Sequence, residues 1–108
     1  MAQKKEPLGF FAMWKATDAW FQEEPARKEE FMKRLQVIFE DAKAKGVKMY
    51  GVYDCCWSSE WRYFTFWECP SLDVLEETMA RLAEMGDINQ YNIQHHFIGR
   101  RLPDEYVQ

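Results

Sequence analysis

The strongest constraint on the fold is an aromatic run, Trp61–Glu68 (WRYFTFWE), with large side chains at both odd and even positions. Alternate residues of a strand point to opposite faces of a sheet, and a sheet with one face in water is polar at every second position. The neighbouring run, Val47–Trp57 (VKMYGVYDCCW), is also aromatic on both sets of positions. Both runs therefore predict strands of a sheet that is covered on both faces.

Aromatic residues make up 17% of the 108 residues, which is more flat apolar surface than one small core needs. A second sheet face left in water would be a large apolar patch, which monomeric proteins rarely expose. The simplest cover is a second copy of the same sheet, because a two-fold dimer buries the same patch on both subunits. The sequence therefore predicts a homodimer. The alternative is an aromatic platform that binds a ligand and stays open to solvent.

Two helices are predicted, one before and one after this hairpin of strands. The first begins at Pro25, because the missing N–H of proline costs nothing at the first helical position, and Gly46 ends it. Between them, apolar residues recur at spacings of three and four, as on the buried face of a helix: Phe31, Leu35, Ile38 and Ala42. The second helix is predicted over Leu72–Met85, with Ser71 as its cap.

Further strands are predicted over Leu8–Lys15 and Tyr91–Arg101, with a polar linker over 16–25. The resulting order is βαββαβ. Two βαβ-like halves joined through a hairpin favour an α+β domain of the ferredoxin-like type, a four-stranded antiparallel sheet with two helices on one face. We expect one such domain over residues 8–101, with tails over 1–7 and 102–108.

The register of the hairpin decides which side chains share a face of the sheet. With the turn centred on Ser59, Tyr53 lies on the same face as Tyr63 and Trp67. A slip of one residue in the turn would change these pairs.

Several classes of function are disfavoured by composition. The net charge of −4 argues against nucleic acid as a partner, because its phosphates call for a basic surface. No apolar run approaches the roughly 20 residues of a membrane-spanning helix, and no secretory signal is visible at the N-terminus, so we expect no membrane association and a cytoplasmic protein. The three cysteines are odd in number, and Cys55 and Cys56 are adjacent. This favours reduced thiols over a disulfide framework, and no metal site is predicted.

His95 and His96 are the only histidines. Adjacent residues of a strand point to opposite faces, so we expect one to enter the cavity between sheet and helices and the other to enter the dimer interface. His96 shares its face with Asn92 and Gln94, which are the more polar surroundings. It is therefore the preferred general acid or base, since histidine titrates near neutral pH. The alternatives are a buried structural histidine and a haem ligand.

Aromatic strand residues are also candidates to contact a ligand, because small-molecule pockets combine aromatic walls with few polar groups. The candidates for stacking against a flat molecule are Trp14, Tyr53, Tyr63 and Trp67. Asn92 and His95 are candidates for further contacts. The alternative is that the aromatic side chains only pack the core and the dimer interface.

The βαββαβ order and the run WRYFTFWECPSLDVLEETM resemble the dimeric α/β-barrel superfamily, and in particular antibiotic-biosynthesis-monooxygenase-like domains. Those domains often have an aromatic third strand that ends near an acidic residue, then a short break and a Ser-Leu helix start. Glu68, Pro70, Ser71 and Leu72 match this style, and the resemblance covers residues 8–101. It implies a homodimer with a ligand pocket between the sheet and its helices.

The same resemblance implies a cofactor-free monooxygenase or an isomerase that acts on a small aromatic or hydrophobic substrate. His96 and Tyr63 are then the candidate catalytic residues, with Tyr53 as a further source of a hydroxyl. The superfamily also contains haem-degrading enzymes and haem-dependent chlorite dismutases, so the alternative is a non-catalytic protein that binds haem or another hydrophobic ligand. The haem-degrading branch uses a histidine near the second helix, whereas Leu72–Met85 contains none. We therefore expect no cofactor, with haem as the alternative.

Overall fold

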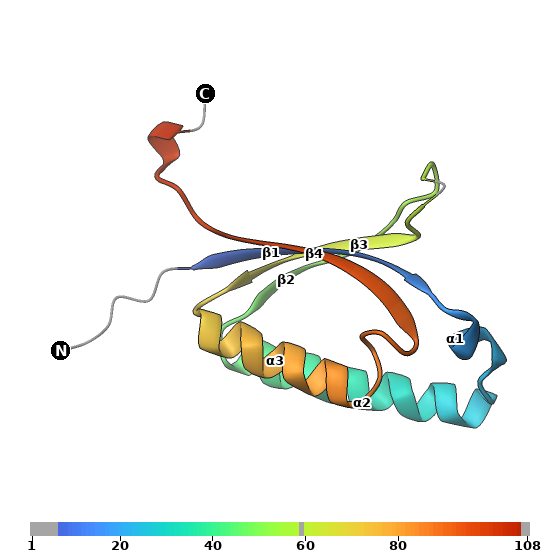
Figure 1. Cartoon of the computed structure of the whole chain (residues 1–108). Helices are drawn as coiled ribbons and strands as arrows, with labels where there is room; N and C mark the ends of the chain where they lie inside the picture. Colours follow the sequence, from blue (N-terminus) through green and yellow to red (C-terminus); the bar gives the residue numbers. More distant parts are fainter. Residues whose placement is uncertain (1–6, 59, 107–108) are drawn as a thin grey trace.

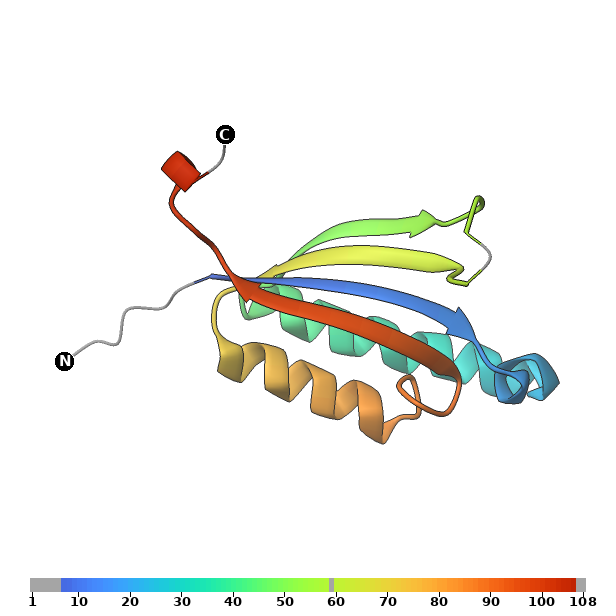
Figure 2. The same cartoon turned by 45° about the horizontal axis from the view of Figure 1, so that its top comes forward.

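The computed structural model describes residues 7–58 and 60–106 of the chain. Its elements are β1 (Leu8–Ala16), α1 (Asp18–Gln22), α2 (Pro25–Ala44), β2 (Lys48–Asp54), β3 (Tyr63–Cys69), α3 (Leu72–Glu84), β4 (Asn92–Arg100) and the 3₁₀ turn η1 (Asp104–Tyr106). The strands form one antiparallel sheet in the order β2-β3-β1-β4. Helices α2 and α3 lie together on one face of this sheet (Figure 1 and Figure 2). The predicted α+β, ferredoxin-like fold is confirmed.

The ends of the two long helices follow the predicted signals. Pro25 opens α2 at its first turn, and the hydroxyl of Ser71 caps α3 by accepting a hydrogen bond from the backbone N–H of Val74 at 3.3 Å. Gly46 and Gly86 follow the helices with φ of 101° and 90°. Residues with a Cβ rarely adopt this left-handed conformation, so glycine is the residue that turns the chain there.

The hydrophobic core lies between the helices and one face of the sheet, here called the helix-facing side. Its largest members are Phe10 of β1 and Trp67 of β3, whose ring centroids are 5.0 Å apart. Helix residues close the core from the other side: Ile38, Ala42, Leu75 and Leu82. Burying each large side chain contributes roughly 1.5–3 kcal/mol, so this layer supplies most of the apolar driving force for folding.

The opposite side of the sheet carries a second set of aromatic rings, here called the outer aromatic face. It consists of Phe11, Tyr50, Tyr53, Phe64, Phe66 and Phe97. Ring contacts through four of them cross all four strands, from Tyr53 through Phe64 and Phe11 to Phe97, and the rings of Tyr50 and Phe66 contact each other. Neither of the long helices, α2 and α3, lies on this side (Figure 1). Four of the six rings are therefore exposed, Phe97 at 55%.

The predicted register of the hairpin is wrong, by one residue near the connection and by two residues beyond a bulge in β2. The connection is also longer than expected. Tyr53 pairs with Phe64 and Asp54 with Tyr63, and the register shifts between Met49 and Val52. Gly51, with φ of 91°, occupies the bulge, where an extra residue is inserted into one strand. Tyr53 consequently lies on the outer aromatic face, opposite to the face that Tyr63 occupies. The expected turn centre, Ser59, lies outside the described residues.

The predicted polar linker over 16–25 is wrong for Asp18–Gln22, which forms the short helix α1. The reason is aromatic packing. The ring of Trp20 lies 5.1 Å from that of Phe31 in α2 and 5.6 Å from that of Tyr91, just before β4. The Tyr91 hydroxyl also donates a hydrogen bond to Glu23 at 2.8 Å. This small cluster fixes the start of β4, the strand that carries both histidines.

Both tails were expected to lie outside the domain. Most of the N-terminal one, residues 1–6, and the last two residues, 107–108, are outside the described part of the chain. After β4 the chain leaves the sheet on the side away from the helices (Figure 1). It forms η1, where Arg101 pairs with Asp104 at 3.2 Å.

Candidate functional site

The two histidines lie on opposite sides of β4, as predicted. His96 is on the helix-facing side, half-buried, with its ring 5.0 Å from that of Phe10. His95 is exposed on the outer side, where its ring contacts those of Phe97 at 4.8 Å and Trp61 at 6.1 Å. Only His96 therefore combines partial burial with a position beside the core.

His96 belongs to a chain of polar side chains that starts at the buried carboxylate of Asp87, a residue 9% exposed in the turn after α3. One carboxylate oxygen accepts a hydrogen bond from Asn92 Nδ2 at 3.0 Å, and the other accepts one from Gln94 Nε2 at 3.1 Å. Gln94 Oε1 lies 2.5 Å from His96 Nε2. The turn and the strand together thus connect a carboxylate to an imidazole through one amide side chain.

Burial sets the protonation preferences of both ends of this network. It lowers the pKa of His96 below its ordinary value, with a smaller contribution from neighbouring His95. It raises the pKa of Asp87, and the amide donors of Gln94 and Asn92 oppose that effect. Burial penalises whichever form is charged, so the imidazole favours its neutral form at neutral pH. A neutral imidazole has one nitrogen lone pair that can accept a proton or bind a ligand.

Sequence reasoning identified Asn92 and His96 and noted Gln94 on the same face, but it did not single out Asp87. The alternation of polar residues along β4 is visible in the sequence and follows from the period of a strand. Asp87 occupies a turn, where aspartate is common for local reasons. Only the path of the chain from α3 back to β4 brings its carboxylate beneath the strand, so no local signal marks it.

The predicted aromatic residues divide between the two faces. Trp14, Tyr63 and Trp67 share the helix-facing side with His96. Trp14 stands between Tyr63 on β3 and Gln94 on β4, with its ring 5.7 Å from that of Tyr63. Tyr63 and His96 are therefore two strands apart, about 10 Å across the sheet, and do not touch. Tyr53 and His95 lie on the outer side, so the structure does not bring them to this site.

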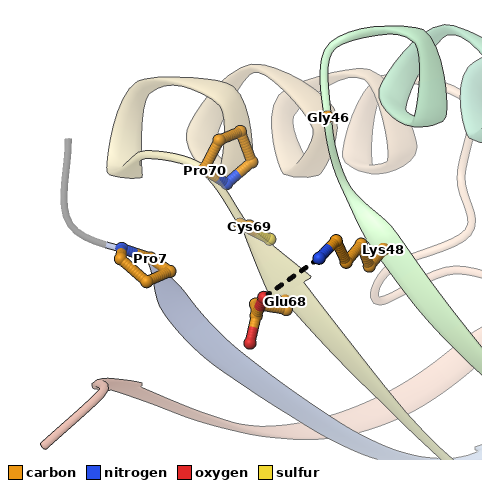
Figure 3. A pocket seen from close by; sticks show the side chains of 6 residues that line it. All are labelled: Pro7, Gly46, Lys48, Glu68, Cys69 and Pro70. Atoms are coloured by element: carbon orange, nitrogen blue, oxygen red, sulfur yellow. Dashed lines mark ion pairs between the residues drawn. The ribbon is translucent and has the colours of Figure 1, made fainter. Parts of the chain in front are cut away.

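Two hollows in the surface lie elsewhere and contain no histidine. One, of about 270 Å³, is lined by Pro7, Gly46, Lys48, Glu68, Cys69 and Pro70 (Figure 3). Its carboxylate, Glu68, is paired with Lys48 at 3.9 Å and Arg101 at 4.0 Å. Burial raises the pKa of the Cys69 thiol to about 11, so this cysteine stays protonated and is a poor nucleophile. The second hollow, of about 400 Å³, is lined by residues of α2 and α3 and by Met85.

Two searches of the described residues bear on other classes of function. No helix among them is long and apolar enough to cross a membrane. No group of three or more His, Cys, Asp or Glu side chains among them is arranged to hold a metal ion.

Solved structures share this fold. Two variants of chlorite dismutase from Candidatus Nitrospira defluvii are similar with TM-scores of 0.75 and 0.73 and sequence identities of 14% and 11%. In both, the match covers 97% of this chain but 44% of chlorite dismutase, so this chain spans less than half the length of that protein. A dimeric ferredoxin-like protein of unknown function from Thermobifida fusca is similar with a TM-score of 0.50 and 13% identity, over 90% of this chain and 94% of that one.

At these identities the likeness shows the fold alone, and the narrower resemblance to monooxygenase-like domains stays a prediction. No protein with a curated description matches this chain in sequence. Residues 9–102 match the family of unknown function DUF6616. Because that match covers most of the chain, the protein belongs to the DUF6616 family.

Proposed function

We propose that this protein binds a small aromatic or hydrophobic molecule beside His96, and that His96 removes a proton from it. The observation that carries the proposal is the half-buried imidazole, favoured in its neutral form, which lies against the ring of Phe10 and is held by Gln94. A general base works best when its pKa lies near or below the working pH and its position is fixed. His96 meets both conditions.

Proton abstraction is the step that the two predicted chemistries share. An isomerase breaks a C–H bond, leaves the electron pair on the substrate and returns the proton to another atom. A cofactor-free monooxygenase begins in the same way, since the deprotonated substrate is the species that can react with O₂. Trp14 and Trp67 are candidates to contact the ligand, and Asn92 to support the site. Tyr63 is too far from His96 to act on the same small group.

A second candidate is non-catalytic binding of haem, which the superfamily resemblance suggests. His96 is the candidate ligand for that group. Metal-binding histidines almost always donate the N–H of the second ring nitrogen to a nearby acceptor, and here Nε2 is the atom held by Gln94. A bound metal would have to reach Nδ1, the nitrogen nearer to the backbone. Neither hollow described above is lined by His96, so the hollows do not separate haem from a smaller ligand.

We also propose that the protein is a homodimer, with the outer aromatic face covered by that of a second copy. The support is the continuous set of exposed rings on that side, since contiguous apolar patches on monomers are uncommon. The similar protein from Thermobifida fusca is described as dimeric. Dimerisation through this side would leave the helix-facing side of β4 free for the ligand.

The test uses 2-tetralone, a flat ketone with an acidic C–H beside its carbonyl, as the probe. In D₂O, removal of that proton replaces the C–H signal by C–D, which proton NMR follows directly. Wild type and the matched control His95→Ala should accelerate the exchange equally. His96→Ala should lose most of the acceleration, because general-base catalysis typically contributes 10²–10⁴-fold.

Equal exchange rates for wild type and His96→Ala would contradict the proposed base. Chemical-shift changes confined to Tyr53 and Phe66 would instead assign the ligand to an open aromatic platform on the outer side. A Soret band that develops with one equivalent of haemin and disappears in His96→Ala would replace catalysis by haem binding.

A further inference from the structure

The nitrogen of His96 that is free to react is set by contacts that begin at the backbone of the turn after α3. The amide nitrogen of Gln94 lies 3.1 Å from a carboxylate oxygen of Asp87 and 3.3 Å from the backbone carbonyl oxygen of the same residue. A backbone carbonyl oxygen can only accept a hydrogen bond. The end of Gln94 that faces Asp87 must therefore be its NH₂ group, whatever the protonation state of the carboxyl group.

This fixes the other end of the same amide. With its NH₂ group directed at Asp87, Gln94 presents its oxygen to His96, at 2.5 Å from Nε2. An amide oxygen has no hydrogen to donate, so the hydrogen in this contact must be carried by Nε2. In the neutral ring the other nitrogen, Nδ1, is then without a proton. No hydrogen bond to Nδ1 is found among the described residues.

We infer that Asp87 and Gln94 are positioning residues that hold neutral His96 as the Nε2–H tautomer and leave Nδ1 as its reactive atom. Asn92 supports the arrangement by donating to the second oxygen of the same carboxylate at 3.0 Å. The inference deepens the proposed function by naming the atom that would take the proton. It rests on hydrogen-bond geometry, so it holds or fails independently of any substrate.

Two substitutions of Gln94 should change the tautomer of His96 in different ways. Gln94→Met keeps the length of the side chain but removes both the donor and the acceptor, so neither ring nitrogen of His96 is preferred by the network. Gln94→Lys keeps a partner for Asp87 but has only donors. A donor facing Nε2 needs a lone pair there, which drives the proton to Nδ1.

Long-range proton–nitrogen correlation spectra of the ring nitrogens measure the tautomer directly, because protonated and bare nitrogens have well-separated shifts. The chain has two histidines, and His95→Gln assigns their signals. In wild type we expect a protonated Nε2 and a bare Nδ1 for His96. In Gln94→Met the ratio of the two tautomers should change by about five-fold, the factor that corresponds to one net hydrogen bond. In Gln94→Lys the assignment should reverse.

Gln90→Lys is the control, since it adds the same charge at an exposed position of the neighbouring turn and should leave the wild-type pattern. Each variant is checked for folding by its amide spectrum. A wild-type Nδ1 that is protonated, or a ratio that is unchanged in both Gln94 variants, would overturn the inference. A wild type that shows the expected tautomer but does not accelerate 2-tetralone exchange would overturn only the proposed function.

Discussion

The two sides of the sheet are built from the same aromatic strands, yet they differ in burial and in the polar partners of their histidines. On the helix-facing side Phe10 is 1% exposed, whereas Phe97 on the outer aromatic face is 55% exposed. The two adjacent histidines differ in the same way. His96 forms a hydrogen bond with Gln94, whereas the side-chain contacts of His95 among the described residues are with the rings of Trp61 and Phe97. An aromatic strand therefore indicates that a surface is covered. It does not indicate what covers that surface. Here the polar partners of His96 distinguish the side that carries the candidate site.

The largest expected difference between the two sides is in stability. Phe10→Ala should lower the free energy of unfolding by about 3–5 kcal/mol, because it leaves a cavity among Trp67 and the helices. Phe97→Ala should cost less than about 1 kcal/mol when measured at concentrations too low for dimers. Urea unfolding at several protein concentrations checks both. Equal losses at low concentration would show that the outer side is as tightly packed as the core.

A charge on the outer aromatic face tests what covers it. Phe66→Glu should weaken self-association by at least about 100-fold, roughly 2.8 kcal/mol, because an unpaired carboxylate would be buried between two sheets. Light scattering should give twice the chain mass of 13.0 kDa for wild type and the single mass for the variant. Val37→Glu, at an exposed position of α2, is the matched control. A monomeric wild type would remove the homodimer and leave the open platform.

The bulge in β2 places both Tyr50 and Tyr53 on the outer aromatic face. We expect it to depend on the hydroxyl of Thr65, a residue on the helix-facing side. Thr65 Oγ1 donates to the carbonyl oxygen of Gly51 at 2.6 Å. Thr65→Val should cost about 1 kcal/mol, the net value of one hydrogen bond. Thr78→Val is the control: this equally buried hydroxyl bonds only the carbonyl of Val74 in its own helix. Matching urea midpoints for the two variants would show that the Thr65 bond does not hold the bulge.

The smallest expected effect is the pH dependence of stability that His96 contributes. Because the pKa of His96 is lowered in the folded chain, the unfolded chain takes up a proton first as the pH falls. The contribution of His96 is therefore fully present above the ordinary pKa of 6.5 and is lost as the pH decreases towards the folded value. Asp87, with its raised pKa, has the opposite dependence, but it is common to all variants.

Urea unfolding between about pH 7.5 and about pH 5.5, a range that spans the ordinary histidine pKa, measures this difference. His96→Gln should lose less stability over that range than wild type. A steeper loss in His96→Gln would mean that burial does not favour the neutral imidazole.

The sequence by itself determined the order of elements, the ends of both long helices and the division of the two histidines. Those features depend on local rules. The period of a strand sends His95 and His96 to opposite faces, and Pro25, Ser71 and Gly86 act on the backbone within one turn.

Tertiary structure decided the features that depend on contacts between distant segments. The bulge at Gly51 moved Tyr53 away from Tyr63, because register depends on the length of the turn and not on the strand pattern. Helix α1 forms because the ring of Trp20 packs against those of Phe31 and Tyr91. Asp87 precedes Asn92 and Gln94 by only a few residues, but the fold of the turn between α3 and β4 brings its carboxylate to both amides. A buried carboxylate needs such partners, and the sequence does not show that the turn buries Asp87, so the candidate site became visible only in the fold.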